Sequence, residues 1–409
     1  LPEDSYKWQF LQDSFRKFAI CFGYQEITTP IFEVSELFER SSGESSDVVQ
    51  KEMYRFCDKK GREFALRPEG TAPVVRSYVE NNLDKLSKRS KLFYLGPMFR
   101  YDRPQAGRYR QFYQYGIEFI GSNNPYYDAE VIAISMLWLN SLGLNKLRLE
   151  INSVGCTDCA ALYDKALQEY YRPFLGKLCP DCQNRFNTNP RRLLDCKVPS
   201  CIELRDDAPS QLNYLDEPCE KHFEAVCNYL QAMKIKYIIN PRIVRGLDYY
   251  TNTAFEIVYE GLGAQNSLAG GGRYNGLIEQ IGGKSVPAIG FAGGFERLLI
   301  ALEEEKINYA EKPKPDAYLV CLGENVRLEV LTYLNDLRIK GLIVDYDPDK
   351  NSMKAQFKAA DASGAKYAII IGEDELANKT INLKNLQTGE QIRVAMNAED
   401  TKQRIRAKI

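Results

Sequence analysis

The sequence lacks the features that mark membrane and secreted proteins. No apolar run approaches the ~18 residues that a membrane-spanning helix requires, and charged residues make up 27% of the chain. The opening stretch, LPEDSYKWQF, mixes polar and charged residues with apolar ones, which is not the pattern of a signal peptide. We therefore expect a globular, cytoplasmic protein without a membrane partner. At 409 residues the chain is too long for one ordinary core, so two or three domains are expected.

The sequence also has only one histidine and almost no net charge. The single histidine, His222, lies in the helical pattern EPCEKHFEAVCNYL with no ligand partner near it, and we interpret it as a structural residue. The formal net charge is -1, so overall basicity cannot hold a nucleic acid, and any such contact must come from a local patch. One patch runs from Lys88 to Arg110, where seven Lys or Arg accompany one acid, Asp102.

Cysteine, in contrast, is abundant. A chain of this class that has no signal peptide is not expected to use its eleven cysteines as a disulfide framework. They are therefore either buried thiols or metal ligands. Seven of them fall within residues 155–220, a stretch rich in Pro, Asn and Arg, and we interpret this stretch as a small inserted module. Cys156, Cys159, Cys179 and Cys182 have a C-x2-C-x19-C-x2-C spacing that fits a structural zinc site, with Cys196 and Cys201 as competing ligands.

The first three hundred residues carry the pattern of an antiparallel sheet. Apolar residues recur at helical spacing over 5–22, and a hairpin is predicted with its turn at 58–61. The segments KLFYLGPMFRYD and QFYQYGIEFIG read as two strands joined by an Arg-rich loop. An α+β domain built on an antiparallel sheet is the expected architecture.

A polar linker, NYAEKPKPD, places a domain boundary near Lys312. We expect a catalytic domain over 1–312, interrupted by the inserted module, and a second domain over 313–409. In the second domain, the short buried strands DAYLVCLG, GLIVDYDPD and KYAIIIGED alternate with helical stretches. This alternation predicts a small parallel α/β domain, and it contains no Gly-rich nucleotide fingerprint.

The Arg-rich segment indicates a polyanion ligand. Arg100, Arg103, Arg108 and Arg110 lie on and after a predicted strand, and guanidinium groups suit phosphate oxygens. Phe112 follows and can stack on a purine or under a guanidinium. A bound nucleoside triphosphate is the sharper interpretation. A solvated basic strand pair is the alternative.

Three further clusters are weaker signals. Glu69 and Thr71 flank a glycine at the start of a predicted helix, where they could hold an ammonium group or simply cap the helix. Arg245 precedes Tyr249 and Tyr250 in RGLDYY, and Arg297 follows glycines in GFAGGFERLL. Glycine lets the backbone approach a ligand, but such residues are also common in strand packing and turns.

Taken in order, these motifs resemble those of a known enzyme family. LRPEGTAPVVR, GPMFRYDRPQAGRYRQFYQYGIEF, RGLDYYTNTAFE, AGGGRYNGL and GFAGGFERLL are similar to the signatures of the histidine–tRNA ligases, which are class II aminoacyl-tRNA synthetases. The segment QFKAADASGAKYAIIIGEDEL resembles the C-terminal anticodon-binding domain of that family. The resemblance implies a class II catalytic fold, ATP-dependent activation of L-histidine to histidyl-adenylate, and transfer of the histidyl group to the 3′ end of tRNA(His) during protein biosynthesis. It also implies ATP and Mg²⁺ as cofactors and a homodimer built around motif 1, near Pro30.

The resemblance implies a role for each matching residue. Arg100 matches the motif 2 arginine that grips the α-phosphate and the substrate carboxylate, and Arg245 matches the arginine that reaches the α-phosphate during activation; both are expected to be catalytic. The residues implied in ATP binding are Arg100, Asp102, Arg108, Phe112 and Arg297. The residues implied in histidine binding are Glu69, Thr71 and Gln114 for the α-amino group, Glu118 and Tyr250 for the imidazole, and Arg100, Arg245 and Tyr249.

Alternatives stay open at this point. The regulatory subunit of ATP phosphoribosyltransferase resembles the same core without charging tRNA, although it typically lacks the C-terminal domain and degrades the RGLDYY and Arg-rich signatures. A class II ligase for proline, threonine or glycine is a second alternative, against which RGLDYY and AGGGRYNG favour histidine. Many members of the resembled family fold the insert without these cysteines. Structural zinc is therefore possible but not favoured.

Overall fold

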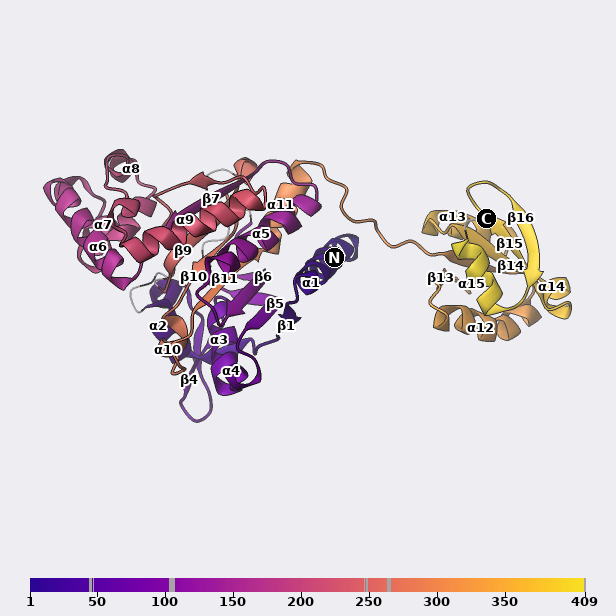
Figure 1. Cartoon of the computed structure of the whole chain (residues 1–409). Coiled ribbons are helices and arrows are strands. Elements are labelled where there is room, and N and C mark those ends of the chain that lie inside the picture. The colour runs from indigo at the N-terminus through magenta and orange to yellow at the C-terminus, as the bar shows by residue number, and fades with distance from the viewer. Residues whose placement is uncertain are drawn as a thin grey trace. The chain divides into compact units, whose positions relative to one another are not determined.

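The computed structural model describes residues 1–43, 46, 48–102, 107–245, 247, 249–262 and 266–407. Two compact units divide the chain, Leu1–Ala310 and Glu311–Ile409 (Figure 1). The predicted boundary at Lys312 lies two residues after the end of the first unit. In the described part of the chain, no helix has the length and apolar character needed to cross a membrane.

An eight-stranded sheet organises the first unit, in the order β1-β5-β6-β11-β10-β9-β7-β8. All pairs are antiparallel except the two at the edges, β1 with β5 and β7 with β8. The expected antiparallel sheet is confirmed, and so are the two strands that flank the Arg-rich loop. The strand bounds are β1 Gln25–Glu26, β5 Ser90–Phe99, β6 Gln111–Ile120, β7 Leu147–Ser153, β8 Ile238–Ile239, β9 Thr251–Tyr259, β10 Ser267–Arg273 and β11 Ala288–Gly294.

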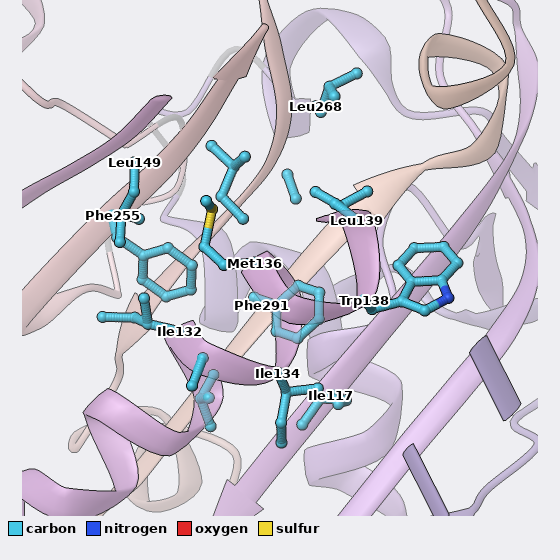
Figure 2. Close-up of a cluster of buried hydrophobic side chains, with 14 of the residues drawn as sticks. Ile117, Ile132, Ile134, Met136, Trp138, Leu139, Leu149, Phe255, Leu268 and Phe291 are labelled. Atoms are coloured by element: carbon cyan, nitrogen blue, oxygen red, sulfur yellow. The ribbon is translucent and has the colours of Figure 1, made fainter. Parts of the chain in front are cut away.

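The main core lies between this sheet and the helix α5 (Pro125–Ser141). Figure 2 shows side chains of α5 packed with side chains from strands of the sheet. The helix is apolar on nearly all sides, as expected for a helix that is buried all round, because it also packs against α9 (Glu217–Ala232). α1 (Pro2–Cys21), predicted over 5–22, adds Leu11 and Phe15 to the same core.

A smaller three-stranded sheet, in the order β2-β4-β3, contains the predicted hairpin. The Asp58 carboxylate accepts the backbone N–H groups of Lys60 and Arg62 in the turn, as acids commonly do in turns. The elements around this sheet are β2 Phe32–Val34, α2 Ser35–Ser42, the π-helix η1 Val48–Glu52, β3 Arg55–Cys57, β4 Glu63–Leu66, α3 Thr71–Glu80, α4 Leu83–Leu86 and α10 Leu277–Gln280.

The inserted module follows β7 and consists of short helices (Figure 1). They are α6 Thr157–Tyr171, η2 Arg172–Lys177, α7 Pro180–Thr188, η3 Pro190–Asp195, α8 Pro199–Arg205 and η4 Gln211–Tyr214. These helices bury their own small cluster of side chains, which includes Tyr163, Leu167 and Leu193. The chain then enters α9 and returns to the sheet, where η5 Glu260–Leu262 and α11 Phe295–Glu304 complete the unit.

The second unit is an α/β domain on a five-stranded sheet, in the order β13-β12-β14-β15-β16. β12, β13 and β14 are parallel, but β15 and β16 pair antiparallel. The prediction of a parallel sheet is thus correct for the first three strands and wrong for the last two, which were not predicted as strands. The bounds are β12 Ala317–Cys321, α12 Glu324–Ile339, β13 Val344–Asp345, α13 Met353–Ser363, β14 Tyr367–Ile371, α14 Glu373–Ala377, β15 Thr380–Asn385, β16 Gln391–Ala395 and α15 Ala398–Arg406.

Candidate active site

A polar cleft of about 530 Å³ opens in the first unit, within the size range of ligand pockets. It brings together seven of the residues predicted from the sequence: Arg100, Asp102, Arg108, Phe112, Gln114, Arg245 and Arg297. They come from the segment around β5 and β6, the segment before β9, and the start of α11. Residues separated by nearly two hundred positions therefore share one cavity.

Residues that follow β5 and begin β6 line one part of the cleft. Arg100 Nε donates to the Pro68 carbonyl at 2.8 Å, and its guanidinium lies 5.3 Å from the centre of the Phe112 ring. Arg108 forms an ion pair with Asp102 at 2.8 Å. Arg110 instead covers the ring of Tyr101 at 4.5 Å and does not line the cleft among the described residues. Arg103 lies outside the described residues.

Arg297 approaches the same cavity from α11. Its Nη1 donates to the Ser267 carbonyl at 2.9 Å. Burial lowers the pKa of Arg297, and the positive charges of Arg108 and Arg100 lower it further. Arg297 therefore lies within electrostatic reach of Arg100 and Arg108, in a cleft lined by five arginines and five acids. A polyanion bound beside these three arginines would offset their mutual repulsion.

Arg245 lines the same cleft from the segment before β9. Its Nη1 forms an ion pair with Glu256, and its guanidinium lies 5.6 Å from the centre of the Tyr250 ring. Its Nε is buried and has no hydrogen-bond partner in the described part of the chain. Buried donors in native structures usually have a partner, so Arg245 has an unused donor in a residue that lines the cleft.

A buried carboxyl group, Glu118, lies on β6 and is fully inaccessible to solvent. Thr71 Oγ1 donates to its Oε1 at 2.7 Å, and the Tyr274 hydroxyl donates to its Oε2. Burial raises the pKa of Glu118 to about 8, although both hydrogen bonds act in the opposite direction. A buried carboxyl whose pKa is shifted toward neutral pH is a common property of functional sites.

Glu69 lies at the N-terminus of α3 and caps it. Its two oxygens accept the backbone N–H groups of Thr71, at 2.6 Å, and Ala72, at 2.8 Å. The helix end is therefore capped by Glu69, whereas Thr71 is the first residue of α3 and donates to Glu118 instead. Each Glu69 oxygen keeps a second lone pair for a ligand. Gln114 Oε1 accepts Gly70 N–H at 3.1 Å and links this helix end to the wall of the cleft.

Four of the predicted histidine-binding residues are buried and form a layer behind the lining of the cleft. Glu69, Thr71, Glu118 and Tyr249 are buried and are not among the described residues that line the cleft. The rings of Tyr249 and Tyr250 lie 4.7 Å apart, and those of Tyr249 and Tyr274 lie 5.8 Å apart. Tyr250 lines a smaller pocket of about 30 Å³ that also includes Arg245.

Two glycines make room for these side chains. A Cβ at Gly270 would lie 2.6 Å from Arg245 Nη1, and a Cβ at Gly290 would collide with the Glu118 carboxylate. Gly270 belongs to the AGGGRYNGL motif, and Gly290 belongs to the strand before GFERLL. The glycines allow the close approach of backbone to these side chains.

Sequence reasoning missed three residues that belong to this arrangement. Tyr274 binds the Glu118 carboxyl, Glu256 pairs with Arg245, and Arg192 of the inserted module lines the cleft and donates to the Arg245 carbonyl at 3.5 Å. Tyr274 and Glu256 lie inside the quoted motifs AGGGRYNGL and TNTAFE, so the signal was present. Arg192 lies in the module, where no motif distinguishes it.

His222 belongs to a separate buried network. Its Nε2 lies 3.2 Å from Asp128 Oδ1, and Asp128 also receives three hydrogen bonds from Arg273. Both Asp128 and Arg273 are fully buried. His222 thus contacts a structural ion pair away from the cleft, as expected for a structural residue.

The four cysteines predicted to share one zinc site do not meet. Cys179 and Cys182 lie with Cys196 and Cys201, whereas Cys156 and Cys159 lie with Asp216 and Cys219. The sequence spacing fitted a single site, but α6 and η2 separate the two Cys-x2-Cys pairs in space. The predicted ligand set is therefore wrong, and the competing cysteines replace half of it.

Together, these residues offer an arginine-lined cavity with an aromatic face, next to a buried acid flanked by hydroxyl groups. Such a cavity can hold a triphosphate and a base by ion pairing and stacking. The buried layer can select a small polar ring, because unpaired buried groups penalise a ligand that cannot complete them.

Comparison with known proteins gives consistent matches. The family model for histidyl-tRNA synthetases matches residues 1–298, and a model for an anticodon-binding domain matches residues 316–407. The histidine–tRNA ligase of Caldanaerobacter subterraneus is 48% identical, over 96% of this chain and 94% of the relative. The enzyme of Halothermothrix orenii is 49% identical over 97% and 94%. The apo histidyl-tRNA synthetase of S. aureus has a TM-score of 0.81 at 41% identity, covering 98% of this chain and 96% of the other.

Proposed function

Because the chain belongs to the histidyl-tRNA synthetase family, we propose that it activates L-histidine with ATP and transfers the histidyl group to the 3′ end of tRNA(His). The observation that carries this proposal is the convergence of Arg100, Arg108, Arg245 and Arg297 on one cleft, beside a buried layer around Glu118. ATP and tRNA are cytoplasmic substrates, and we propose the same location for the chain.

ATP occupies the arginine-lined cleft in this proposal. Phe112 already lies beneath the Arg100 guanidinium, and its ring stacks on the adenine. Asp102 receives the adenine amino group, while Arg108 and Arg297 hold phosphate oxygens. Burial and neighbouring cations lower the pKa of Arg297, which supports this role, because bound phosphate would offset both effects. Mg²⁺ bound with ATP would neutralise charge on the phosphate oxygens, and most of its ligands would be water and phosphate oxygen.

Histidine occupies the space between the cleft and the buried layer. Glu69, Thr71 and Gln114 lie together at the start of α3 and hold the α-amino group. Glu118 and Tyr250 read the imidazole, with Tyr249 packed against Tyr250. A carboxyl and a phenol can satisfy the two nitrogens of an imidazole in a way that a hydrocarbon ring cannot match.

Activation requires positioning and charge stabilisation. The carboxylate of histidine is already ionised at neutral pH, so its attack on the α-phosphorus needs no general base. Arg100 grips the carboxylate and the α-phosphate. Arg245, with a buried and unpartnered Nε, stabilises the charge that moves onto the α-phosphate oxygens.

We assign the anticodon arm of tRNA(His) to the C-terminal unit, which the anticodon-binding model matches over 316–407. Deleting residues 311–409 should weaken tRNA charging while histidine-dependent pyrophosphate exchange is largely retained. Equal loss of both activities in a folded truncation would reject this division.

We also propose a homodimer, formed through the small three-stranded sheet. Its outer surface exposes Ile31, Phe32, Val34 and Phe56, and contiguous exposed apolar residues are typical of interaction sites. Light scattering at micromolar concentration should give twice the 46.8 kDa mass of one chain. The mass of a single chain would contradict this assembly.

The central test is amino-acid-dependent pyrophosphate exchange across the twenty amino acids. Histidine alone should support exchange. Exchange with proline, threonine or glycine would favour a different class II ligase. No exchange with any amino acid, combined with histidine binding, would favour a regulatory subunit such as that of ATP phosphoribosyltransferase.

A further inference from the structure

The inserted module contains two cysteine clusters that the proposed activity does not use. Cluster A consists of Cys179, Cys182, Cys196 and Cys201, whose sulfur atoms all lie within 4.8 Å of one another. Cluster B consists of Cys156, Cys159, Asp216 and Cys219, whose ligand atoms meet the same limit. All eleven cysteines are free thiols, so neither cluster is a disulfide pair.

The dimensions of cluster A match a single tetrahedral ion. A zinc ion bound by four thiolates at about 2.3 Å places the sulfur atoms roughly 3.8 Å apart, and Cys179 Sγ lies 3.8 Å from Cys196 Sγ. An iron–sulfur cubane holds each cysteine on a different iron atom, and this spreads the four sulfurs more widely than one shared ion does. We propose that cluster A binds one structural Zn²⁺.

The surroundings of cluster A also suit thiolate ligands. The backbone N–H of Cys179 donates to Cys201 Sγ at 3.3 Å, and that of Val198 donates to Cys196 Sγ at 3.5 Å. Such donors orient and stabilise the ligands of a metal. The sulfurs come from α7, the end of η3 and α8, so one ion would join three separate segments.

A bound metal ion would stabilise the small core of the module. Three of the ten buried residues of its core are cysteines, and the helices that present the ligands have nine, six and seven residues. Helices this short are marginal without tertiary support, and small cores commonly rely on metals or disulfides. A shared ion would explain why three buried thiols and one half-buried thiol gather around one point.

Cluster B carries a second proposal on independent geometry. Cys156 Sγ lies 3.5 Å from Cys159 Sγ and 3.4 Å from Asp216 Oδ2. The Asp216 backbone N–H donates to Cys159 Sγ at 3.1 Å, and Asn252 Nδ2 donates to Cys219 Sγ at 3.4 Å. Asp216 Oδ1 caps α9, which leaves Oδ2 as a ligand atom.

The position of cluster B gives it a distinct purpose. Cys156 and Cys159 lie where the chain enters the module after β7, and Asp216 and Cys219 lie where it leaves into α9. We infer that a second Zn²⁺ binds here and closes the base of the module, held against the sheet by Asn252 near the start of β9.

Metal counting separates the two proposals. The full chain, purified in reducing buffer without chelator, should contain about two zinc ions per chain by mass spectrometry of the elements. The Cys182→Ser/Cys201→Ser variant and the Cys156→Ser/Cys219→Ser variant should each lose one. A matched control, Cys21→Ser/Cys57→Ser, changes two exposed thiols outside both clusters and should keep both ions.

The outcomes are distinct. One zinc per chain, lost only in the first variant, would overturn cluster B alone; one zinc, lost only in the second, would overturn cluster A alone. A metal-free chain, or iron in place of zinc, would overturn both proposals. If a variant fails to fold, Co²⁺ added to the chelator-treated wild-type chain provides the decisive measurement. It should give the visible bands and thiolate charge transfer of tetrahedral cobalt at two equivalents, and their absence would overturn both sites.

Cluster A also bears on the cleft, a consequence that rests on the proposed function. Cys196 directly follows η3, and η3 carries Arg192 to the cleft and to the Arg245 carbonyl. Loss of the ion from cluster A should therefore raise the KM for ATP several-fold, and Cys21→Ser/Cys57→Ser should not. Unchanged KM in a zinc-depleted variant would overturn this coupling. The metal count would stand independently.

Discussion

Arg273 and Arg245 lie in the same unit and are both largely buried, yet their surroundings differ. Arg273 is fully inaccessible, and its donors reach Asp128 and the carbonyls of Ser122 and Asn124. Arg245 lines a cleft, has one acid partner, and keeps a buried Nε without a partner in the described residues. A guanidinium whose donors are all satisfied by protein is structural, whereas one left incomplete at a cavity is prepared for a ligand.

The change with the largest expected effect breaks the ion pair between Asp128 and Arg273. Asp128→Asn should leave Arg273 charged and buried without its partner and lower the free energy of unfolding by about 3–5 kcal/mol. Denaturant unfolding followed by tryptophan fluorescence measures it, because Trp8 and Trp138 both lie in the first unit. Glu217→Gln, which breaks the exposed pair with Lys221, should have little effect. Equal small losses in both variants would contradict the assignment.

The second change removes Arg245, the arginine with an unpartnered Nε in the described residues. Arg245→Ala should lower kcat for adenylate formation about 10²–10³-fold, with a modest change in the KM for ATP and in thermal stability. Transfer from preformed adenylate should suffer less. Arg242→Ala is the matched control, since Arg242 is an exposed arginine paired with Asp206. If Arg245→Ala lowers only the thermal stability, Arg245 is a structural residue like Arg273.

A pH series sharpens the comparison at Glu118, which is neither paired with a cation nor exposed. Its folded pKa of about 8 lies above the ~4.3 of an unfolded glutamate. The folded state therefore binds more protons, and the stability from Glu118 is lost as pH rises through the interval up to about 8. Relative to wild type, Glu118→Gln should gain about 2 kcal/mol between pH 6 and 8. A difference that does not change with pH would show that Glu118 is ionised at neutral pH.

The smallest expected effect concerns one hydroxyl group. Tyr274→Phe removes the hydrogen bond to Glu118 and should cost about 1 kcal/mol of unfolding free energy. Tyr115→Phe is the control, because the Tyr115 hydroxyl is buried without a partner in the described residues. Its loss should be neutral or slightly stabilising. The same denaturant midpoint of unfolding for both variants would show that the Tyr274 hydroxyl does not contribute to stability.

The sequence predicted the parts of the fold that local pattern controls. The strands on either side of the Arg-rich loop could be read from their apolar runs, and the residues around them were found to line the cleft. β15 and β16 were missed, because their pairing depends on contact with β14 and their own sequences are only partly apolar. Tertiary context decides such strands more than intrinsic preference does.

The site was predictable where a residue carries its chemistry alone, and not where it acts through a partner. Arg245 and Glu118 could be singled out by type and motif. Their partners, Glu256 and Tyr274, lie inside the quoted motifs, but which residue each one contacts could be identified only from the fold. The cysteines show the same limit, because spacing along the chain suggested one quartet and the fold forms two. Sequence distance fixes neighbours within a turn, and only packing fixes neighbours across segments.

The closeness of Cys156 and Cys159 to Asp216 and Cys219 has a consequence for engineering. The module begins and ends at nearly one point, and the described strands of the eight-stranded sheet all lie outside it. Segments with adjacent ends tolerate exchange better than segments that span a domain. A short Gly-Ser linker from 155 to 217 could therefore replace the module as a removable cassette. The shortened chain would keep its sheet and lose Arg192, making a scaffold in which the wall of the cleft can be rebuilt independently of the fold.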